Sequence, residues 1–562
     1  MHIALQYRLT HYVILLAAVA VIGLPRLGEA SLWDMDEGLN AEAAREMHES
    51  GNWIVPKFNF QLRDAKPALL YWAQGAAYQF FGMNEFAARL PSVIAAALAT
   101  LLTYELGRRM FSPVGGLLGG VALISSSSIA FAARFANPDA LLLACTALTF
   151  FVFWHGYVPR RAGESPRRGW FIPVGIACGL ATLAKGPVGV LLPALVIGVF
   201  LIWQRQLRLL FDRRALYGML AFLLVAAPWY VLVSVVTRGE FATGFFITNN
   251  VRRFLEPMEY HRGPILYHPA ILLSGLAPWS IFVGFTFWYA VKVVIQREKM
   301  SESGFTPLSL RPAYRLLVCW VVVYVLFFTI AATKLPNYTL PVFPAIALLT
   351  GRFLDSWQRR EINPPRWLFA SGLVLLILIG ISTSLAMLVI GGDLRLPGLE
   401  VRQLAGLGKS WWIGLLPLVG GTAAAVAWLA DRREWAISAV GVAAVGFLAA
   451  ALADPLLRVD SHKPCRDLVA ESGAFDRRHE IRLASFQFTQ PSLVFYSQRE
   501  VRQLLTDDDV AQFLHSPLPV YLFVPESAWN GLSARHPELL AKVRARKWDF
   551  YRKGNVLVVS NQ

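Results

Sequence analysis

The chain has 562 residues, of which 56% are hydrophobic and 13% aromatic, and its mean hydropathy is +0.47. This composition excludes an ordinary soluble protein and predicts a polytopic membrane protein. The formal net charge of +16 does not require nucleic acid as a partner, because the basic residues lie mostly in short loops between apolar runs.

About thirteen apolar runs are long enough to cross a bilayer as helices. The first, about 9–28, is expected to be a retained helix, because no clear cleavage site of small residues accompanies it. The pattern around Lys185 is compatible with one long helix or with a tight hairpin. The other runs are about 86–107, 113–133, 138–157, 170–184, 186–203, 215–237, 268–291, 314–332, 338–354, 367–391, 411–430 and 433–453.

The basic residues predict the orientation of these helices. With the N-terminus inside, the alternate short loops from Arg108-Arg109 to Arg432-Arg433 would all face the cytoplasm, as the positive-inside rule requires. The odd number of helices then places the C-terminal segment outside. The first loop, about 29–85, also lies outside, and two short amphipathic helices are expected in it, at Gly38–Gly51 and Pro67–Phe81.

The C-terminal segment differs in character from the rest of the chain. Helical patterns and strand-like runs alternate after about residue 461, which predicts a small soluble α/β domain. We therefore divide the chain into a transmembrane domain with outer loops, 1–455, and an outer α/β domain, 456–562. The expected helices are Lys463–Ser472, Asp507–His515 and Ala534–Arg546, and the expected strands are Ile481–Phe486, Val520–Val524 and Val556–Ser560.

Charged residues gather on the outer side of this topology. The carboxylates Asp34, Asp36 and Glu37 follow the first apolar run, where a helix is expected to begin. Clustered carboxylates at a membrane surface are typical of chemistry or ion binding. Cations on this side run against the positive-inside rule, and a phosphate-bearing ligand would explain them. They include Arg63, Lys66, Arg134, Lys185, Arg252, Arg253, His261 and Lys334.

Each of these residues also has a simpler explanation. Asp36 and Asp139 are placed to cap or begin a helix, and Arg252-Arg253 would suit nonspecific contact with lipid headgroups. Arg45 is expected to form surface ion pairs with Glu42 and Glu49 at helical spacing. The recurrence of charge on one face of the membrane favours a site.

Several motifs in about 1–350 together resemble a known family. They are Asp-Met-Asp-Glu-Gly-Leu-Asn-Ala-Glu-Ala-Ala-Arg-Glu-Met (34–47), Asp-Ala-Lys-Pro-Ala-Leu-Leu-Tyr-Trp (64–72), Arg-Phe-Ala-Asn-Pro-Asp (134–139), Asn-Val-Arg-Arg-Phe (250–254), His-Arg-Gly-Pro (261–264) and Thr-Lys-Leu-Pro-Asn-Tyr (333–338). These motifs resemble the integral-membrane glycosyltransferases of the GT-C type, in the group related to protein mannosyltransferases. Within this group the chain is most similar to the transferases of 4-amino-4-deoxy-L-arabinose to lipid A.

The resemblance implies the fold, the reaction and the site. The expected fold is a polytopic α-helical membrane protein of the GT-C type with a periplasmic C-terminal α/β domain. The expected enzyme lies in the bacterial inner membrane, takes aminoarabinose from undecaprenyl phosphate and transfers it to a lipid A phosphate at the periplasmic face. The product would confer resistance to cationic peptides such as polymyxin. The implied catalytic residues are Asp36 and Asp139, and the implied substrate-binding residues are Glu37, Arg63, Lys66, Tyr71, Arg252, Arg253, His261, Tyr267, Lys334 and Tyr338.

The chemistry narrows these roles. A departing lipid phosphate needs its charge neutralised, which suits Lys66, Arg253 and Lys334. Asp36 would act as a general base toward a hydroxyl acceptor, but toward a phosphate acceptor its role would be electrostatic or positional. The residues indicate no definite cofactor. A divalent metal is left open, because Asp36, Glu37 and His261 are suitable ligand types without diagnostic spacing.

Other functions remain open at this point. A related enzyme would move another sugar from the same carrier to a protein hydroxyl or another glycolipid. A transporter of the lipid-linked sugar is less favoured, because the ionisable residues collect at one face rather than near the middle of the bilayer. In each case the protein is embedded in the lipid bilayer. We expect it to be a monomer. The chain departs from the family at Ala65, where glutamate is often found, and Asp64 lies one position earlier.

Overall fold

The computed structural model describes residues 2–158, 168–258, 261–295, 310–395, 403–475, 480–537, 539 and 541–562. The chain forms two compact units, which we call the helical unit and the mixed unit. The helical unit comprises Met1–Pro25, Asp64–Leu69 and Pro91–Ala453. The mixed unit comprises Arg26–Arg63, Leu70–Leu90 and Asp454–Gln562, so most of the first outer loop belongs with the C-terminal segment. The division of the chain at 455/456 stays a prediction.

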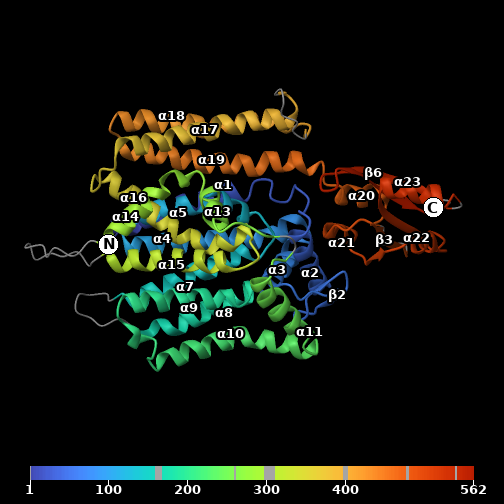
Figure 1. Cartoon of the computed structure of the whole chain (residues 1–562), viewed down its shortest axis with the longest axis horizontal. Helices are drawn as coiled ribbons and strands as arrows, with labels where there is room; N and C mark the ends of the chain where they lie inside the picture. Colours follow the sequence, from blue (N-terminus) through green and yellow to red (C-terminus); the bar gives the residue numbers. More distant parts are fainter. Residues whose placement is uncertain are drawn as a thin grey trace, which may run out of the picture. The chain divides into compact units, whose positions relative to one another are not determined.

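The helical unit is built from helices joined mostly by short turns (Figure 1). α4 and α19 run from one unit into the other along the chain. Its elements are α1 (His2–Gly23), α4 (Glu85–Met110), α5 (Pro113–Ile124), α6 (Ser127–Ala133), α7 (Asp139–Tyr157), η1 (Arg168–Trp170), α8 (Phe171–Lys185), α9 (Val188–Trp203), η2 (Leu207–Leu209), α10 (Arg214–Val236), α11 (Glu240–Ala242), the π-helix η3 (Thr243–Arg252), α12 (Arg253–Leu255), α13 (Tyr267–Gly275), η4 (Trp279–Phe282), α14 (Val283–Ile295), α15 (Arg311–Ile330), η5 (Pro336–Val342), α16 (Phe343–Gln358), α17 (Arg366–Gly391), η6 (Leu407–Gly414), α18 (Leu415–Leu429) and α19 (Arg433–Asp460).

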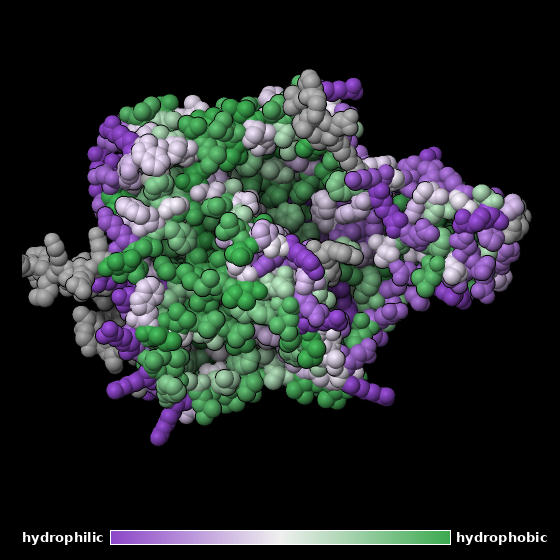
Figure 2. Space-filling model, viewed as in Figure 1, coloured by the Kyte–Doolittle hydropathy of each residue, from purple (hydrophilic) through white to green (hydrophobic). Residues whose placement is uncertain are grey.

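These helices make the chain a multi-pass membrane protein. Eight described helices are long and apolar enough to cross a bilayer, or ten if each of two bent pairs crosses once. The bent pairs are α5 with α6, at 67°, and α13 with the η4–α14 segment, at 114°. Figure 2 shows hydrophobic side chains spread over one face of these helices. Each predicted apolar run falls on a helix or on a bent pair, while the number of spans stays a prediction.

The chain around Lys185 forms a tight hairpin of two helices, and two glycines make it possible. α8 ends at Lys185, and Gly186 follows with φ +88°, a backbone conformation that residues with a side chain rarely adopt. A Cβ on Gly189 would lie 2.3 Å from the carbonyl carbon of Ala181, so α9 approaches α8 more closely than another residue would allow. The chain therefore turns tightly here and does not continue as one helix.

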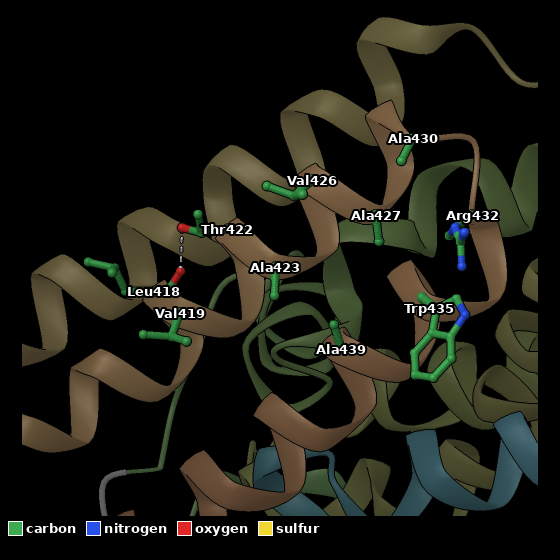
Figure 3. Close-up of a pocket in the computed structure, with 10 residues that line it drawn as sticks. All are labelled: Leu418, Val419, Thr422, Ala423, Val426, Ala427, Ala430, Arg432, Trp435 and Ala439. Carbon is green, nitrogen blue, oxygen red and sulfur yellow. Dashed lines mark hydrogen bonds between the residues drawn. The ribbon is translucent and has the colours of Figure 1, made fainter.

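A groove of about 700 Å³ lies between α18 and α19 (Figure 3). Its lining is almost entirely apolar, and the hydroxyl of Thr422 donates a hydrogen bond to the carbonyl of Leu418, 2.8 Å away. Arg432 is the charged residue among those that line it. Such a surface suits hydrocarbon rather than a sugar or a phosphate, and none of the predicted site residues lines it.

The mixed unit contains a five-stranded sheet in the order β4-β3-β5-β7-β6. β3 is parallel to β4 and β5, whereas β7 pairs antiparallel with β5 and β6. Neighbouring residues of β7, such as Leu557 and Val558, belong to separate apolar clusters, so both faces of the sheet are covered. The strands are β3 (Arg482–Phe486), β4 (Val501–Leu504), β5 (Val520–Pro525), β6 (Lys542–Asp549) and β7 (Gly554–Ser560).

Helices from both parts of the chain complete the mixed unit (Figure 1). From the first loop come α2 (Asp36–Ser50), α3 (Leu69–Phe81) and a small hairpin of β1 (Lys57–Phe58) and β2 (Gln61–Leu62). Around the sheet are α20 (Cys465–Ser472), α21 (Pro491–Ser497), α22 (Asp507–Leu514) and α23 (Glu526–Arg535). The two helices expected in the first loop are confirmed.

Most of the elements expected in the C-terminal segment are confirmed as well, but one is wrong. The helix expected over Ala534–Arg546 does not form as predicted: α23 ends at Arg535, and among the described residues that follow, Lys542–Asp549 forms the edge strand β6. The run of basic residues there resembles the solvated face of a helix. It instead lines an edge strand, where charged side chains discourage pairing with another chain.

Candidate active site

The three carboxylates that follow the first apolar run have different surroundings. Glu37 is fully buried and pairs with Arg89 through both oxygens, at 2.7 and 2.9 Å. The Asp34 carboxylate accepts hydrogen bonds from the backbone N–H and the hydroxyl of Ser492, at 2.8 and 2.9 Å. Asp36 is exposed, and its carboxylate has no hydrogen-bond or ion-pair partner among the described residues. Asp36 alone of the three is therefore open to a ligand.

Neither Asp36 nor Glu37 caps the helix that follows. The N-cap of α2 is Met35, with φ +70° and ψ −81° and no side-chain cap. Both carboxylates lie in the first turn, where the helix dipole favours negative charge. Burial raises the pKa of the neighbouring Asp34 to about 6, although the two bonds from Ser492 act in the opposite direction.

The ion pairs of Arg45 form as expected, but the predicted surface position is wrong for Arg45 and Glu42, whereas Glu49 is exposed. Arg45 bonds to Glu42 and Glu49, yet Arg45 is 1% exposed and Glu42 is fully buried. The reason is that α2 is covered by other parts of the mixed unit: Tyr78 of α3, for example, donates to the carbonyl of Ala41 at 3.1 Å. The i,i+3 spacing predicts the contact and says nothing of its burial.

Arg63 and Tyr71 lie beside the face of α2 that carries Asp36. The Arg63 guanidinium donates to the hydroxyl of Tyr71 at 3.0 Å and to the amide oxygen of Asn40 at 3.1 Å. Asn40 follows Asp36 by one helical turn, so the two residues share a face of α2. The guanidinium is therefore held on the helix face of the free carboxylate. Within the mixed unit, the structure thus brings together Asp36, Arg63 and Tyr71.

Asp139 is the centre of a buried polar cluster in the helical unit. One of its oxygens pairs with the ammonium of Lys185, and the other accepts from the amide of Asn337 at 2.8 Å. The Lys185 ammonium also lies 5.5 Å from the ring centre of Tyr338. Three elements meet here: α7 begins at Asp139, α8 ends at Lys185, and η5 carries the other two residues. The Asp139 carboxylate is thus neutralised and held.

Lys334 lies in a second group at the end of α15. It is 7% exposed, and its ammonium donates to the carbonyl oxygens of Phe328 and Thr329. Its backbone N–H donates to the carbonyl of His261 at 3.0 Å. A side chain at Gly263 would meet Tyr267 at 2.9 Å and Lys334 at 3.2 Å, so these two side chains flank that glycine. Burial lowers the pKa of Lys334.

The ring of Phe328 links the two groups. It packs against the ring of Tyr338, with centroids 4.9 Å apart, and near His268, at 6.1 Å. The structure therefore brings together a set of predicted residues within the helical unit: Asp139, His261, Tyr267, Lys334 and Tyr338. Lys185, Asn337 and His268 join them. Lys185 was expected among the outer cations and Asn337 lies in a motif, but neither pattern indicated their partners, and nothing in the sequence singled out His268.

The remaining predicted cations lie along or near the π-helix η3. Arg252 is exposed and forms an i,i+4 ion pair with Glu256 at 2.9 Å, whereas Arg253 is half-buried. Lys66 is half-buried, and its segment packs on η3, because a side chain at Gly244 would collide with the Asp64 carboxylate. π-helical turns are rare in proteins overall, but those that occur are frequently found at functional sites.

The described residues do not provide a set of ligands for the divalent metal that the sequence left open. Among the residues that the structure describes, no group of three or more histidine, cysteine, aspartate or glutamate side chains is arranged to hold a metal ion. The carboxylates of Asp34 and Glu37 are already occupied by Ser492 and Arg89.

Comparison with known proteins gives the family. Residues 9–239 match the family of dolichyl-phosphate-mannose-protein mannosyltransferases. The undecaprenyl phosphate-α-4-amino-4-deoxy-L-arabinose arabinosyl transferase of Pseudomonas aeruginosa is 30% identical over 437 residues, which are 75% of this chain and 72% of that protein. The chain belongs to this family of aminoarabinosyl transferases. The family resemblance predicted from the motifs is thereby confirmed.

Other family members match over a shorter stretch. The transferase of Erwinia tasmaniensis is 31% identical over 328 residues, 57% of this chain and 55% of that protein. A transferase of Sodalis glossinidius is 32% identical over 357 residues, 62% of this chain and 60% of that protein. The chain thus spans somewhat more than half the length of these two curated family members.

A crystal structure shows the same fold along the whole chain. ArnT from Cupriavidus metallidurans, bound to undecaprenyl phosphate, has a TM-score of 0.77 and 24% sequence identity, over 98% of each chain. The predicted fold class, a GT-C-type helical membrane protein with a C-terminal α/β domain, is confirmed.

Proposed function

We propose that this family member is a glycosyltransferase that moves 4-amino-4-deoxy-L-arabinose from undecaprenyl phosphate to a phosphate of lipid A. The curated family members are named for aminoarabinosyl transfer from undecaprenyl phosphate, and ArnT of the same fold was crystallised with that lipid. The basic loops on the opposite side support a site at the periplasmic face of the inner membrane. The domain after residue 455 lies in the periplasm as well.

The observation that carries this proposal is the buried ammonium of Lys334. Its hydrogen bonds go to carbonyl oxygens, and in the part of the chain that the structure describes it has no carboxylate partner. A buried charge without a counterion is costly, and a phosphate would supply the missing negative charge. We assign Lys334 to the phosphate of the donor, together with Lys66, Arg253 and the hydroxyl of Tyr338.

The transfer itself is a single displacement in this proposal. An oxygen of the acceptor phosphate attacks the anomeric carbon of aminoarabinose, while the bond from that carbon to the donor phosphate breaks. The electron pair of this bond leaves with undecaprenyl phosphate, whose negative charge Lys334 and its neighbours stabilise. One displacement inverts the configuration at the anomeric carbon.

The carboxylates take different roles in this scheme. The acceptor phosphate is already an anion, so Asp36 need not remove a proton. Asp36 instead stabilises positive charge on the sugar, either at the reacting carbon or on the 4-ammonium group. Asp139 holds Lys185 and Asn337 in place. Arg252, His261 and Tyr267 bind substrate near the donor phosphate, while Arg63 and Tyr71 do so beside Asp36.

Mass spectrometry of lipid A tests the proposal directly. Cells with the gene should carry aminoarabinose on lipid A phosphate, and cells without it should not. The purified chain should perform the same transfer in detergent from undecaprenyl phosphate–aminoarabinose. Sugar found on a protein or another glycolipid would contradict the proposed acceptor. A chain that binds the donor without turning it over would contradict an enzymatic role.

A further inference from the structure

The backbone that leads to Asp36 is fixed to the C-terminal part of the mixed unit. Tyr496 of α21 accepts a hydrogen bond from the N–H of Leu32 at 2.7 Å. The hydroxyl of Tyr551 accepts from the N–H of Asp34 at 3.1 Å. Lys463 donates to the carbonyl of Ser31 at 2.6 Å. The segment before Asp36 therefore takes its conformation from residues more than four hundred positions later in the chain.

A further attachment, made by two hydrogen bonds, joins Asp34 to the start of α21. Ser492 donates to both oxygens of the Asp34 carboxylate, through its backbone N–H at 2.8 Å and its hydroxyl at 2.9 Å. α2 then runs directly along α21, since a Cβ on Gly38 would lie 2.6 Å from the backbone nitrogen of Ser492. Asp36 stands between these two contacts, and the same short helix holds the chain on both sides of it.

The backbone between the contacts is strained. Met35 has φ +70° and ψ −81°, a conformation that residues with a side chain seldom adopt and that surrounding structure must impose. Met35 itself is 65% exposed, so burial of its side chain does not account for this conformation. The restraints come from its neighbours, because Asp34 is bound to Ser492 and Glu37 to Arg89.

We infer that α21 of the C-terminal domain positions Asp36 for the reaction, with Asp34 and Ser492 as the positioning residues. This inference rests on the proposed role of Asp36. Asp34 does not touch the substrate in this view, although it belongs to the same acidic run. Its carboxylate holds the strained turn that immediately precedes Asp36, whose side chain is exposed. The C-terminal domain then contributes directly to catalysis without contributing a catalytic residue.

The two substitutions of Asp34 separate a positioning role from a catalytic one. Asp34→Asn keeps an oxygen for the Ser492 N–H and places an amide beside the Ser492 hydroxyl, so the attachment survives while the charge is lost. Asp34→Ala removes the attachment. We expect kcat to fall by about 30-fold in Asp34→Ala and by less than about 3-fold in Asp34→Asn. The KM for the donor should change by less than about 2-fold in both variants.

Ser492→Ala provides a milder change with a matched control. It removes one of the two bonds to Asp34 and should lower kcat by about 5-fold. Ser497, also buried in α21, donates its hydroxyl to the carbonyl of Val494 within the helix, so Ser497→Ala should leave kcat unchanged. All variants are purified as full chains and assayed with undecaprenyl phosphate–aminoarabinose and lipid A. Thermal unfolding of each variant identifies any loss of folded protein.

The possible results distinguish this inference from the proposed function. Wild-type kcat in both Asp34→Ala and Ser492→Ala would overturn the positioning role while leaving the proposed function intact. An equal loss in Asp34→Asn and Asp34→Ala would overturn it too, because the charge rather than the attachment would then matter. Absence of transfer by the wild-type chain would contradict the proposed function and this inference with it.

Discussion

Glu37 and Arg89 form a buried ion pair that ties the start of α2 to the start of α4. Arg89 also donates to three backbone carbonyls, those of Leu27, Ala30 and Ser31, at 2.7 to 2.9 Å. One guanidinium thus fixes the end of the first apolar run and the acidic turn that follows. Because Arg89 binds both Glu37 oxygens, this carboxylate stabilises the acidic turn and has little left to offer a substrate.

Breaking this pair should destabilise the protein rather than weaken substrate binding. Arg89→Met leaves the buried Glu37 without a partner, and we expect a loss of about 3 kcal/mol in the free energy of unfolding. Thermal unfolding in detergent measures the loss. The double variant Glu37→Gln/Arg89→Met should recover part of it, because no charge is then left buried. A single variant with wild-type stability would contradict this reading of the pair.

Asp36→Asn should abolish transfer without changing stability. Asp36 is exposed and has no partner among the described residues, so folding does not depend on its charge. We expect the transfer rate to fall by at least about 100-fold with an unchanged unfolding temperature. Asp508 offers a matched control, as an exposed aspartate in the first turn of α22, and Asp508→Asn should keep full activity. A nearly normal transfer rate in Asp36→Asn would contradict the catalytic role assigned to Asp36.

Lys334→Met should show the opposite combination of activity and stability. Removing a buried ammonium that lacks a carboxylate partner should stabilise the free protein, by about 1 kcal/mol. The same change removes the proposed phosphate contact, so undecaprenyl phosphate should no longer raise the unfolding temperature. Lys409 is an exposed lysine of the helical unit, and Lys409→Met should respond to the lipid as the wild type does. Full protection of Lys334→Met by undecaprenyl phosphate would contradict the assignment.

The sequence predicts those features that depend on neighbouring residues. Apolar length alone places the helices, and the period of the pattern places α2 and α20. The edge strand β6 was missed because its pairing with β7 outweighs a run of basic residues that suits a helix. Local pattern carries no information about that pairing.

The site shows the same limit more clearly. Asp34, Asp36 and Glu37 look equivalent in the sequence, and only their distant partners separate them. Arg89 and Ser492 lie far along the chain and belong to no motif, so nothing local marks them as the groups that occupy Glu37 and Asp34. The motifs identify the neighbourhood of the site, whereas the folded structure shows which carboxylate is free.

The pH dependence of stability should carry a contribution from Glu46. Burial, and then the charge of Glu42, raises the pKa of Glu46 from 4.5 to about 7. The folded state therefore holds a proton that the unfolded state releases, so this contribution to stability is full below pH 4.5 and is lost as the pH rises to about 7. Glu46→Gln should remove that loss, because an amide oxygen still accepts the bond from the N–H of Phe60.

At pH 8 the Glu46→Gln variant should be more stable than the wild type, on the order of 1 kcal/mol, and at pH 4.5 the two should be nearly equal. Unfolding temperatures across this range measure the difference, and Glu500→Gln, at an exposed glutamate of the same unit, gives the baseline. Parallel curves for Glu46→Gln and the wild type would show that Glu46 is ionised in the folded protein throughout.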